Sequence, residues 1–176
     1  MPPGIITQNK RIDFQDLMLY RVHEILLVAS PYDAFILEED GKLTEQILHE
    51  YIGMNFNYAP RVWQANSAKA ALEMLSKRKL DIVIVMMRIA DMNPLSFGLK
   101  VKKMYPRKPV ILLAFDESEI KQLPEETLQN SVDRVFVWSG NANVFPAIIK
   151  QIEDKKNSKR DILEGDVRAI ILVEDT

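Results

Sequence analysis

The sequence predicts an α/β fold with a doubly wound, mainly parallel sheet. Short apolar runs alternate five times with longer amphipathic stretches over about residues 22–155, and three of the runs are almost continuously apolar. Continuous apolar runs are typical of strands that are covered on both faces of a sheet. Alternation of this kind joins parallel strands through right-handed crossovers, and ligand sites in such sheets lie at the carboxyl ends of the strands.

The predicted strands are short and rich in Val, Ile and Leu, and a stretch with helical periodicity follows each of them. The five strands are Glu24–Ala29, Pro60–Ala65, Asp81–Met87, Pro109–Ala114 and Asp133–Trp138. The third strand runs directly into an irregular loop, which is where a reactive carboxylate would be expected in this fold. The strand ends instead in two methionines, Met86 and Met87.

Capping residues and helix breakers set the bounds of the predicted helices. Ser30 and Asp33 can cap the first helix, which is expected to break or kink at Gly41. The apolar residues that recur at helical spacing in it are Phe35, Ile36, Leu43, Ile47, Leu48 and Tyr51. Asn66 and Ser67 precede a second helix of strong helix formers. The remaining predicted helices are 95–105, a short irregular one over 117–128, and 141–155.

Two segments flank the predicted domain, which spans residues 23–155. Residues 1–22 form an N-terminal extension, and an amphipathic helix is expected there, packed on the domain or on a partner. The apolar residues that recur at helical spacing in it are Ile12, Phe14, Leu17, Met18 and Val22. Residues 156–176 are expected to form a charged linker and then the first strand of a following domain, because the chain ends "IILVEDT".

The composition narrows the class of protein. The chain is 47% hydrophobic and 27% charged, which is normal for a globular domain with a full core. A net charge of −2 gives no basic field that would attract nucleic acid or an anionic membrane. Cysteine is absent, and no apolar run approaches the roughly 20 residues of a spanning helix. We therefore expect a cytoplasmic protein that binds neither nucleic acid nor membrane.

The alternation, the Asp that opens the third strand, the "PVI" of the fourth and the "DRVFV" of the fifth resemble the receiver domain of bacterial response regulators. The resemblance covers about residues 22–155 and implies a flavodoxin-like, five-stranded parallel sheet with strand order 2-1-3-4-5. It also implies a chemistry. A receiver transfers a phosphoryl group to an Asp after its third strand. In a receiver, an acidic pair after the first strand holds Mg²⁺. A Ser or Thr after the fourth strand and a Lys after the fifth strand contact the phosphoryl group.

Each of those positions lacks the expected residue in this chain. The acidic pair falls on Ala29 and Ser30, and the acceptor falls on Met86, or on Met87 if the register slips by one. The hydroxyl position is Ala114, and the Lys position is Val137 or Trp138. Without acceptor, metal ligands and counter-ion, no catalysis and no cofactor are expected, so the chain looks like a pseudo-receiver. The alternative is a working receiver that uses a non-standard acceptor such as Asp91, in the loop after the third strand.

Other segments are similar to receiver-like regions of larger phosphoenolpyruvate synthase-type proteins, although nothing of that enzyme's active site lies in them. These segments are "DFQDLM", "ILLVASPYDAFILEED", "DRVFVW" and "IILVED". The chain would then be the N-terminal region of a multidomain protein. A small enzyme or nucleotide binder is disfavoured, because the loops after the strands hold no Gly-rich phosphate cradle, no Ser-His pair and no acidic cluster.

The sequence therefore predicts a phosphorylation-independent regulatory or protein-interaction module with a phosphorelay-type scaffold, acting in signal transduction. Its expected partners are another protein, neighbouring domains of a longer chain, or a second copy in a homodimer. Trp138, Phe145 and Ile149 are the predicted interaction surface. A buried Trp138 would instead fill the pocket in which a receiver holds its phosphoryl group. Asp33 and Glu38 are expected on a solvated helix face rather than at a metal site.

Overall fold

The computed structural model describes residues 19–39, 42–53, 59–138 and 143–164, and its centre is a sheet of five parallel strands. The strand order is β2-β1-β3-β4-β5, which confirms the predicted 2-1-3-4-5 order and the flavodoxin-like fold. The strands are β1 (Glu24–Val28), β2 (Arg61–Ala65), β3 (Ile82–Met86), β4 (Val110–Ala114) and β5 (Arg134–Val137). Their carboxyl ends are aligned, because Val28 pairs with both Ala65 and Val85, and Ala114 pairs with Val137.

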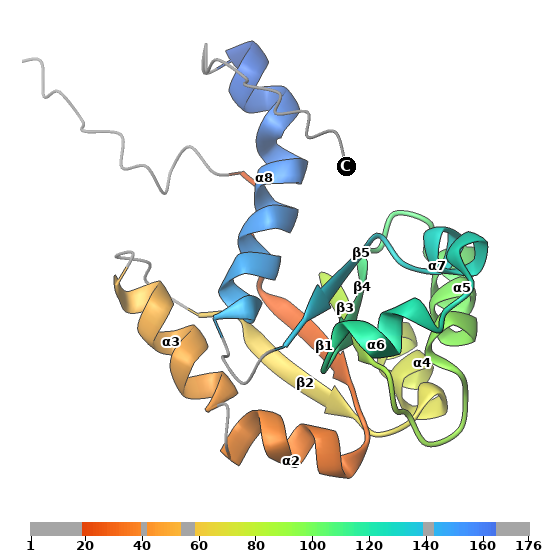
Figure 1. Ribbon diagram of the computed structural model, residues 1–176. Coiled ribbons are helices and arrows are strands. Elements are labelled where there is room, and N and C mark those ends of the chain that lie inside the picture. Colours follow the sequence, from red (N-terminus) through yellow and green to blue (C-terminus); the bar gives the residue numbers. More distant parts are fainter. Residues whose placement is uncertain (1–18, 40–41, 54–58, 139–142, 165–176) are drawn as a thin grey trace, which may run out of the picture.

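Helices cover both faces of the sheet (Figure 1). One face carries α2 (Pro31–Glu39), α3 (Leu43–Gly53) and α8 (Val144–Glu164). The other carries α4 (Ala68–Lys77), α5 (Pro94–Met104) and α7 (Glu125–Ser131), and the short α6 (Glu117–Lys121) follows β4. None of the helices in the described ranges is long and apolar enough to cross a membrane.

Alternate residues of each central strand pack against opposite layers. Ile25 and Leu27 join the core cluster that contains α3 and α8, whereas Leu26 and Val28 join the cluster that contains α4 and α5. Every residue of β3 and β4 is buried. Because both side-chain directions meet a helix layer, these strands read as continuous apolar runs in the sequence.

The first predicted helix is two helices, α2 and α3, on either side of residues 40–41, in agreement with the break expected at Gly41, which itself lies outside the described residues. Helix bounds differ from the prediction in two other places. The irregular stretch 117–128 is also two short helices, separated before Glu125 by Pro124, whose ring cannot continue α6. The last helix continues to Glu164, so residues 156–164, predicted as part of a charged linker, are helical. Residues 165–176 lie outside the described residues.

The segment that leads into β1 is attached to α8 by side chains. Tyr20 and Asn157 exchange two hydrogen bonds of 2.9 Å: the Tyr20 amide donates to Asn157 Oδ1, and Asn157 Nδ2 donates to the Tyr20 carbonyl. One helical turn earlier, Glu153 Oε1 accepts from the Val22 amide at 2.8 Å. Burial raises the pKa of Tyr20 to about 12 and raises the pKa of Glu153. Residues 19–22, predicted as the end of an amphipathic helix, are therefore not helical, and residues 1–18 lie outside the described residues.

A glycine sets the closest approach between α5 and α7. A Cβ at Gly98 would lie 2.5 Å from the backbone oxygen of Ser131, which cannot move without shifting α7. We predict that Gly98→Ala lowers the free energy of unfolding by about 1–3 kcal/mol through overpacking. The measurement is urea unfolding followed by circular dichroism. Gly53→Ala is the matched control, because a Cβ at Gly53 meets nothing within 4 Å. Equal effects of the two substitutions would contradict this account.

Candidate functional site

The predicted site positions lie along one rim of the sheet, at the carboxyl ends of its strands. Ala29 and Ser30 follow β1, Met86 ends β3, and Ala114 and Val137 end β4 and β5 side by side. Backbone bonds hold the first two in place: the Ala29 amide donates to the Ala65 carbonyl at 3.0 Å, and the Ser30 amide donates to the Arg88 carbonyl at 2.9 Å. The rim is therefore the surface on which any receiver-type chemistry would have to occur.

Apolar side chains fill the interior of this rim. Met86 and Ala114 are fully buried, and Trp138 retains 6% of its surface. The Trp138 ring packs edge-on against Phe115, with centroids 5.4 Å apart. Of the two interpretations of Trp138, the structure supports the buried plug. Its Nε1 has no hydrogen-bond acceptor among the described residues.

The prediction that Trp138, Phe145 and Ile149 form an interaction surface is wrong, because all three side chains are buried. Phe145 and Ile149 are completely buried, because both point from α8 into the core cluster beneath the sheet. Trp138 belongs to the same cluster. Phe145 and Ile149 lie one helical turn apart on the inward side of α8, Trp138 is buried after β5, and none of the three is available to a partner.

A buried carboxylate that the sequence did not reveal lies beside the rim. Asp33, predicted to face solvent, is fully buried in the first turn of α2. The Ser30 hydroxyl accepts from the Asp33 amide at 3.1 Å and caps the helix, as predicted. The Asp33 carboxylate lies 3.4 Å from the guanidinium of Arg88, which follows β3 and remains 59% exposed. No hydrogen bond reaches this carboxylate within the described part of the chain.

Arg88 also connects the carboxylate to the aromatic pair. Its guanidinium carbon lies 5.3 Å from the centre of the Phe115 ring, within cation–π range. Asp33, Arg88, Phe115 and Trp138 thus form a continuous row of contacts, the rim row, with one member after each of β1, β3, β4 and β5. No motif or spacing in the sequence singles out Arg88. Its position between Asp33 and Phe115 follows only from the strand order, in which β3 lies between β1 and β4.

Asp91 has a structural partner in α4. Its two carboxylate oxygens accept from the amides of Ala68 at 2.6 Å and Lys69 at 3.0 Å, and these bonds hold the pKa of Asp91 below its usual range. Ser67 caps the same helix by accepting from the Ala70 amide at 3.2 Å. The carboxylate therefore ties the loop after β3 to the amino terminus of α4. Within the described ranges, no group of three His, Asp or Glu side chains is placed to share a metal ion.

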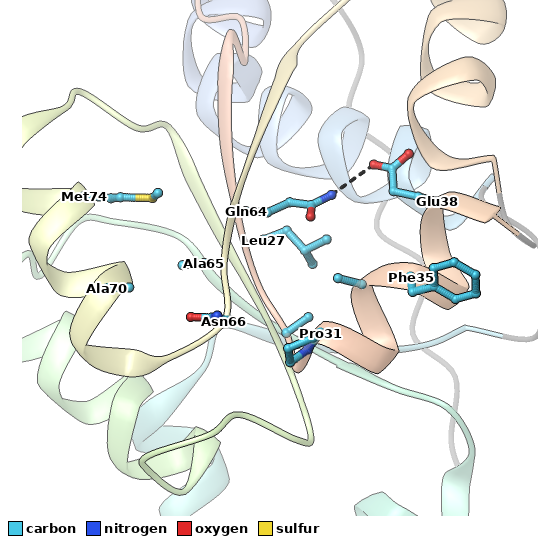
Figure 2. Close-up of a pocket in the computed structure, with 11 residues that line it drawn as sticks. Leu27, Pro31, Phe35, Glu38, Gln64, Ala65, Asn66, Ala70 and Met74 are labelled. Carbon is cyan, nitrogen blue, oxygen red and sulfur yellow. Dashed lines mark hydrogen bonds between the residues drawn. The ribbon is translucent and has the colours of Figure 1, made fainter.

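A cavity of about 540 Å³ opens beside this rim, between α2, the end of β2 and α4 (Figure 2). Its walls include Pro31 and Phe35 of α2 and Met74 of α4. Phe35, one of the apolar residues that recur at helical spacing in the first predicted helix, is 61% exposed. Gln64 donates a hydrogen bond of 3.1 Å to Glu38 across the cavity edge, so Glu38 joins α2 to β2 rather than facing only solvent.

The ion pair of the rim row can be tested by a double-mutant cycle. We predict that Arg88→Ala lowers the free energy of unfolding by about 1–3 kcal/mol, because it leaves the buried Asp33 carboxylate without a counter-charge. Adding Asp33→Asn to that variant is expected to recover most of the loss, since no charge is then buried. Urea unfolding of both single variants and the double variant measures the coupling. Strictly additive effects would show that the two side chains do not stabilise each other.

No protein-family model matches this chain, and comparison with curated protein sequences also gave no match. Solved structures do match. The signal receiver domain of an HD domain-containing protein from Pseudomonas fluorescens Pf-5 is 21% identical, with 81% of this chain and 95% of that chain covered and a TM-score of 0.58. A response regulator receiver domain protein from Clostridium thermocellum is 17% identical, with 77% and 97% covered and a TM-score of 0.56. Chemotaxis response regulator CheY4 of Vibrio cholerae is 16% identical, with 74% and 98% covered and a TM-score of 0.52. The chain therefore has the fold of response regulator receiver domains.

Proposed function

We propose that this chain is a phosphorylation-independent, receiver-like module that works in signal transduction through protein contacts and is not an enzyme. The observation that carries the proposal is the rim row. Arg88 contacts Phe115, and Phe115 contacts Trp138, at the strand ends, where the resemblance implies a metal ion and a phosphoryl group. A response regulator from Thermotoga maritima with the same fold, at 17% identity and a TM-score of 0.53, was solved in complex with Mg²⁺ and BeF.

The chemistry of phosphoryl transfer supports this proposal. The transferring oxygens need a divalent ion and a cationic side chain for charge neutralisation, and the divalent ion needs oxygen ligands. The corresponding positions carry the methyl of Ala29, the thioether of Met86 and the methyl of Ala114, all buried in the core. Arg88, the cation that follows β3, already faces Asp33 and Phe115.

The alternative, a working receiver with Asp91 as acceptor, requires a free carboxylate oxygen. An attacking oxygen cannot keep its hydrogen bond to an amide in the same geometry, and both Asp91 oxygens accept from α4. Phosphorylation there would therefore have to release the amino terminus of α4. This cost favours a structural role for Asp91.

The proposed partner is a second copy of the chain, bound through α2. Tyr32 and Phe35 lie one turn apart on this helix and are 66% and 61% exposed. Large aromatic side chains of this exposure are common anchors of protein interfaces. The neighbouring β2 is an edge strand of the sheet, and no strand in the described part of the chain pairs with its outer side, which suits pairing with a strand of another molecule.

We predict that acetyl phosphate or beryllofluoride with Mg²⁺ leaves the protein unmodified, with unchanged tryptophan fluorescence and melting temperature. The physical reason is that Met86 and Ala114 supply neither acceptor nor ligand. Intact-protein mass spectrometry and fluorescence titration measure this. A mass increase of one phosphoryl group that disappears in Asp91→Asn would establish the alternative function. The same increase in both proteins would point to another acceptor and would also overturn the proposal.

We predict a homodimer at micromolar concentration that Phe35→Glu converts to a monomer, because a carboxylate replaces an exposed aromatic anchor. Light scattering across a concentration series measures the mass. Leu99→Glu is the matched control, since Leu99 is also an exposed apolar residue, 40% accessible, but lies on α5 on the other face of the sheet. A chain that ends at Glu164 tests whether residues 165–176 cause the association. A monomeric wild type, or a dimer that survives Phe35→Glu, would refute the proposed interface.

A further inference from the structure

A second concave surface lies at the opposite end of the sheet, where β3 and β4 begin. A cavity of about 540 Å³ is formed there by the segment before β1, the residues before β3 and the loop between α5 and β4. Tyr20, Tyr105 and Pro106 contribute to its walls. The proposed function makes no use of this end, because receiver chemistry is expected at the carboxyl ends of the strands.

Positive side chains dominate this cavity. Lys79, Arg107, Lys108 and Lys156 line it, and Asp81 is the carboxylate among its lining residues. This concentration of positive charge contrasts with the net charge of −2 of the whole chain. Lys79 and Arg107 are exposed and form no salt bridge with any carboxylate in the described part of the protein.

The Asp81 carboxylate is already engaged by the backbone. Its Oδ2 accepts from the amides of His23 at 2.8 Å and Glu24 at 3.0 Å, where the chain enters β1. These two bonds fix the start of β1 against the start of β3. Asp81 therefore serves the fold, and it neutralises only part of the charge that faces the cavity.

The lysines around the cavity lie close enough to repel one another. Burial lowers the pKa of Lys108, and the charges of Lys156 and Lys79 lower it further, against an opposing effect of Asp81. The Lys108 ammonium donates to the Leu80 carbonyl, which fixes its position at the cavity wall. Lys108 thus supplies a fixed positive group at the cavity wall, next to the exposed side chains of Lys79 and Arg107.

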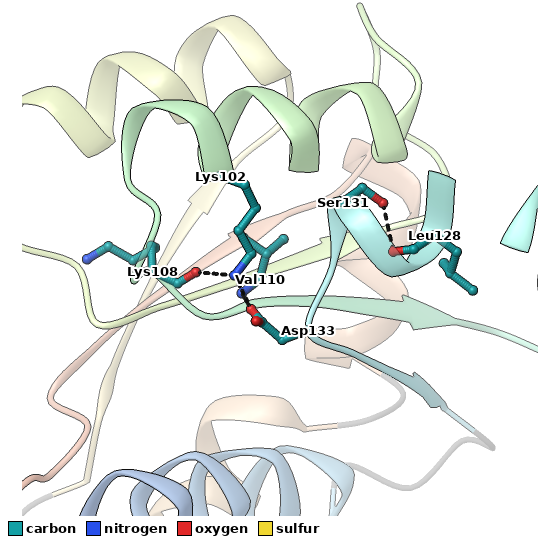
Figure 3. A network of polar contacts seen from close by, with 6 residues as sticks. All are labelled: Lys102, Lys108, Val110, Leu128, Ser131 and Asp133. Atoms are coloured by element: carbon teal, nitrogen blue, oxygen red, sulfur yellow. Dashed lines mark hydrogen bonds and ion pairs between the residues drawn. The ribbon is translucent and has the colours of Figure 1, made fainter. Parts of the chain in front are cut away.

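An adjoining cavity of about 670 Å³ extends the basic surface. It shares Pro106, Arg107, Pro109 and Lys156 with the first cavity, and among its other charged lining residues are Arg134, Lys155 and the carboxylate of Asp154. The carboxylate of Asp133 lies at this edge, but Lys102 and the Val110 amide hold it, and Lys102 also donates to the Lys108 carbonyl at 2.8 Å (Figure 3). The Asp133 carboxylate, like that of Asp81, is thus held by partners within the protein, whereas Arg107 and Arg134 are exposed.

We propose that the cavity beside Lys79, Arg107 and Lys156 binds a small, multiply charged anion that carries phosphoryl groups, of the diphosphate or triphosphate type. Guanidinium and ammonium groups match phosphoryl oxygens in charge and hydrogen-bond geometry. The cavity volume is that of a small-molecule site. Binding here would join the segment before β1, the end of α4, the loop before β4 and α8 through one ligand.

Isothermal titration calorimetry with inorganic tripolyphosphate tests the proposal on the full chain, at about 0.15 M salt so that unspecific surface attraction is screened. The test variant is Lys79→Gln/Arg107→Gln. The matched control is Lys69→Gln/Lys121→Gln, which removes the same charge from exposed positions that follow the carboxyl ends of β2 and β4. We expect the test variant to bind about tenfold more weakly or worse, and the control to change by less than about twofold. Melting temperatures of both variants verify that they fold.

Two further binding experiments identify which kind of molecule carries the phosphoryl groups. ATP competing with tripolyphosphate would indicate a free nucleotide, whereas binding to phosphatidylcholine vesicles only when they contain a phosphoinositide would indicate a lipid headgroup; both outcomes support the site. Absence of tripolyphosphate binding to the wild type would overturn it. Equal weakening in test and control variants would also overturn it, because the attraction would then be general. Binding of heparin without binding of tripolyphosphate would indicate a long acidic polymer and would refute a small-ligand cavity.

Discussion

The side chains of β3 and β4 have no access to water, because two apolar clusters cover the sheet from both sides. Buried backbone in such a sheet must form all its hydrogen bonds with neighbouring strands, and polar side chains are excluded from its faces. Within β3 and β4, charged side chains are therefore absent, and Asp81, Arg88 and Asp133 lie just before or after strands of the sheet. The two rims are thus the places where the sheet meets charged groups.

The two rims have opposite character. At the carboxyl rim, Met86, Ala114 and Trp138 continue the apolar core to the strand ends, and the Arg88 charge is balanced by Asp33. At the amino rim, Asp81 and Asp133 bind backbone amides and leave the surrounding cations uncompensated. At the carboxyl rim, apolar packing therefore fills the space between the strand ends. At the amino rim, excess positive charge faces the solvent.

Much of the fold could be predicted because the spacing of apolar residues along the sequence indicates which side chains of each strand and helix are buried. The strands, their order and the caps at Ser30 and Ser67 followed from local patterns or from the resemblance. The surroundings of single side chains did not follow. The surroundings of Asp33 include Arg88, which lies fifty-five positions further along the chain. The surroundings of Trp138 likewise include Phe115, which precedes it by more than twenty positions. Phe35 shares the helical spacing of the apolar residues around it, yet its side chain is 61% exposed. The contact of residues 20–22 with α8 spans more than a hundred residues and has no local signature.

The hydrogen bonds between Tyr20 and Asn157 have a mechanical consequence. The chain enters β1 and passes along α8 at the same place, so a force applied to both flanks would load this one pair of residues before any strand of the sheet. A force that pulled residue 19 away from α8 would therefore act first on the bonds that Glu153 and Asn157 make with the entering backbone, before it reached the strands.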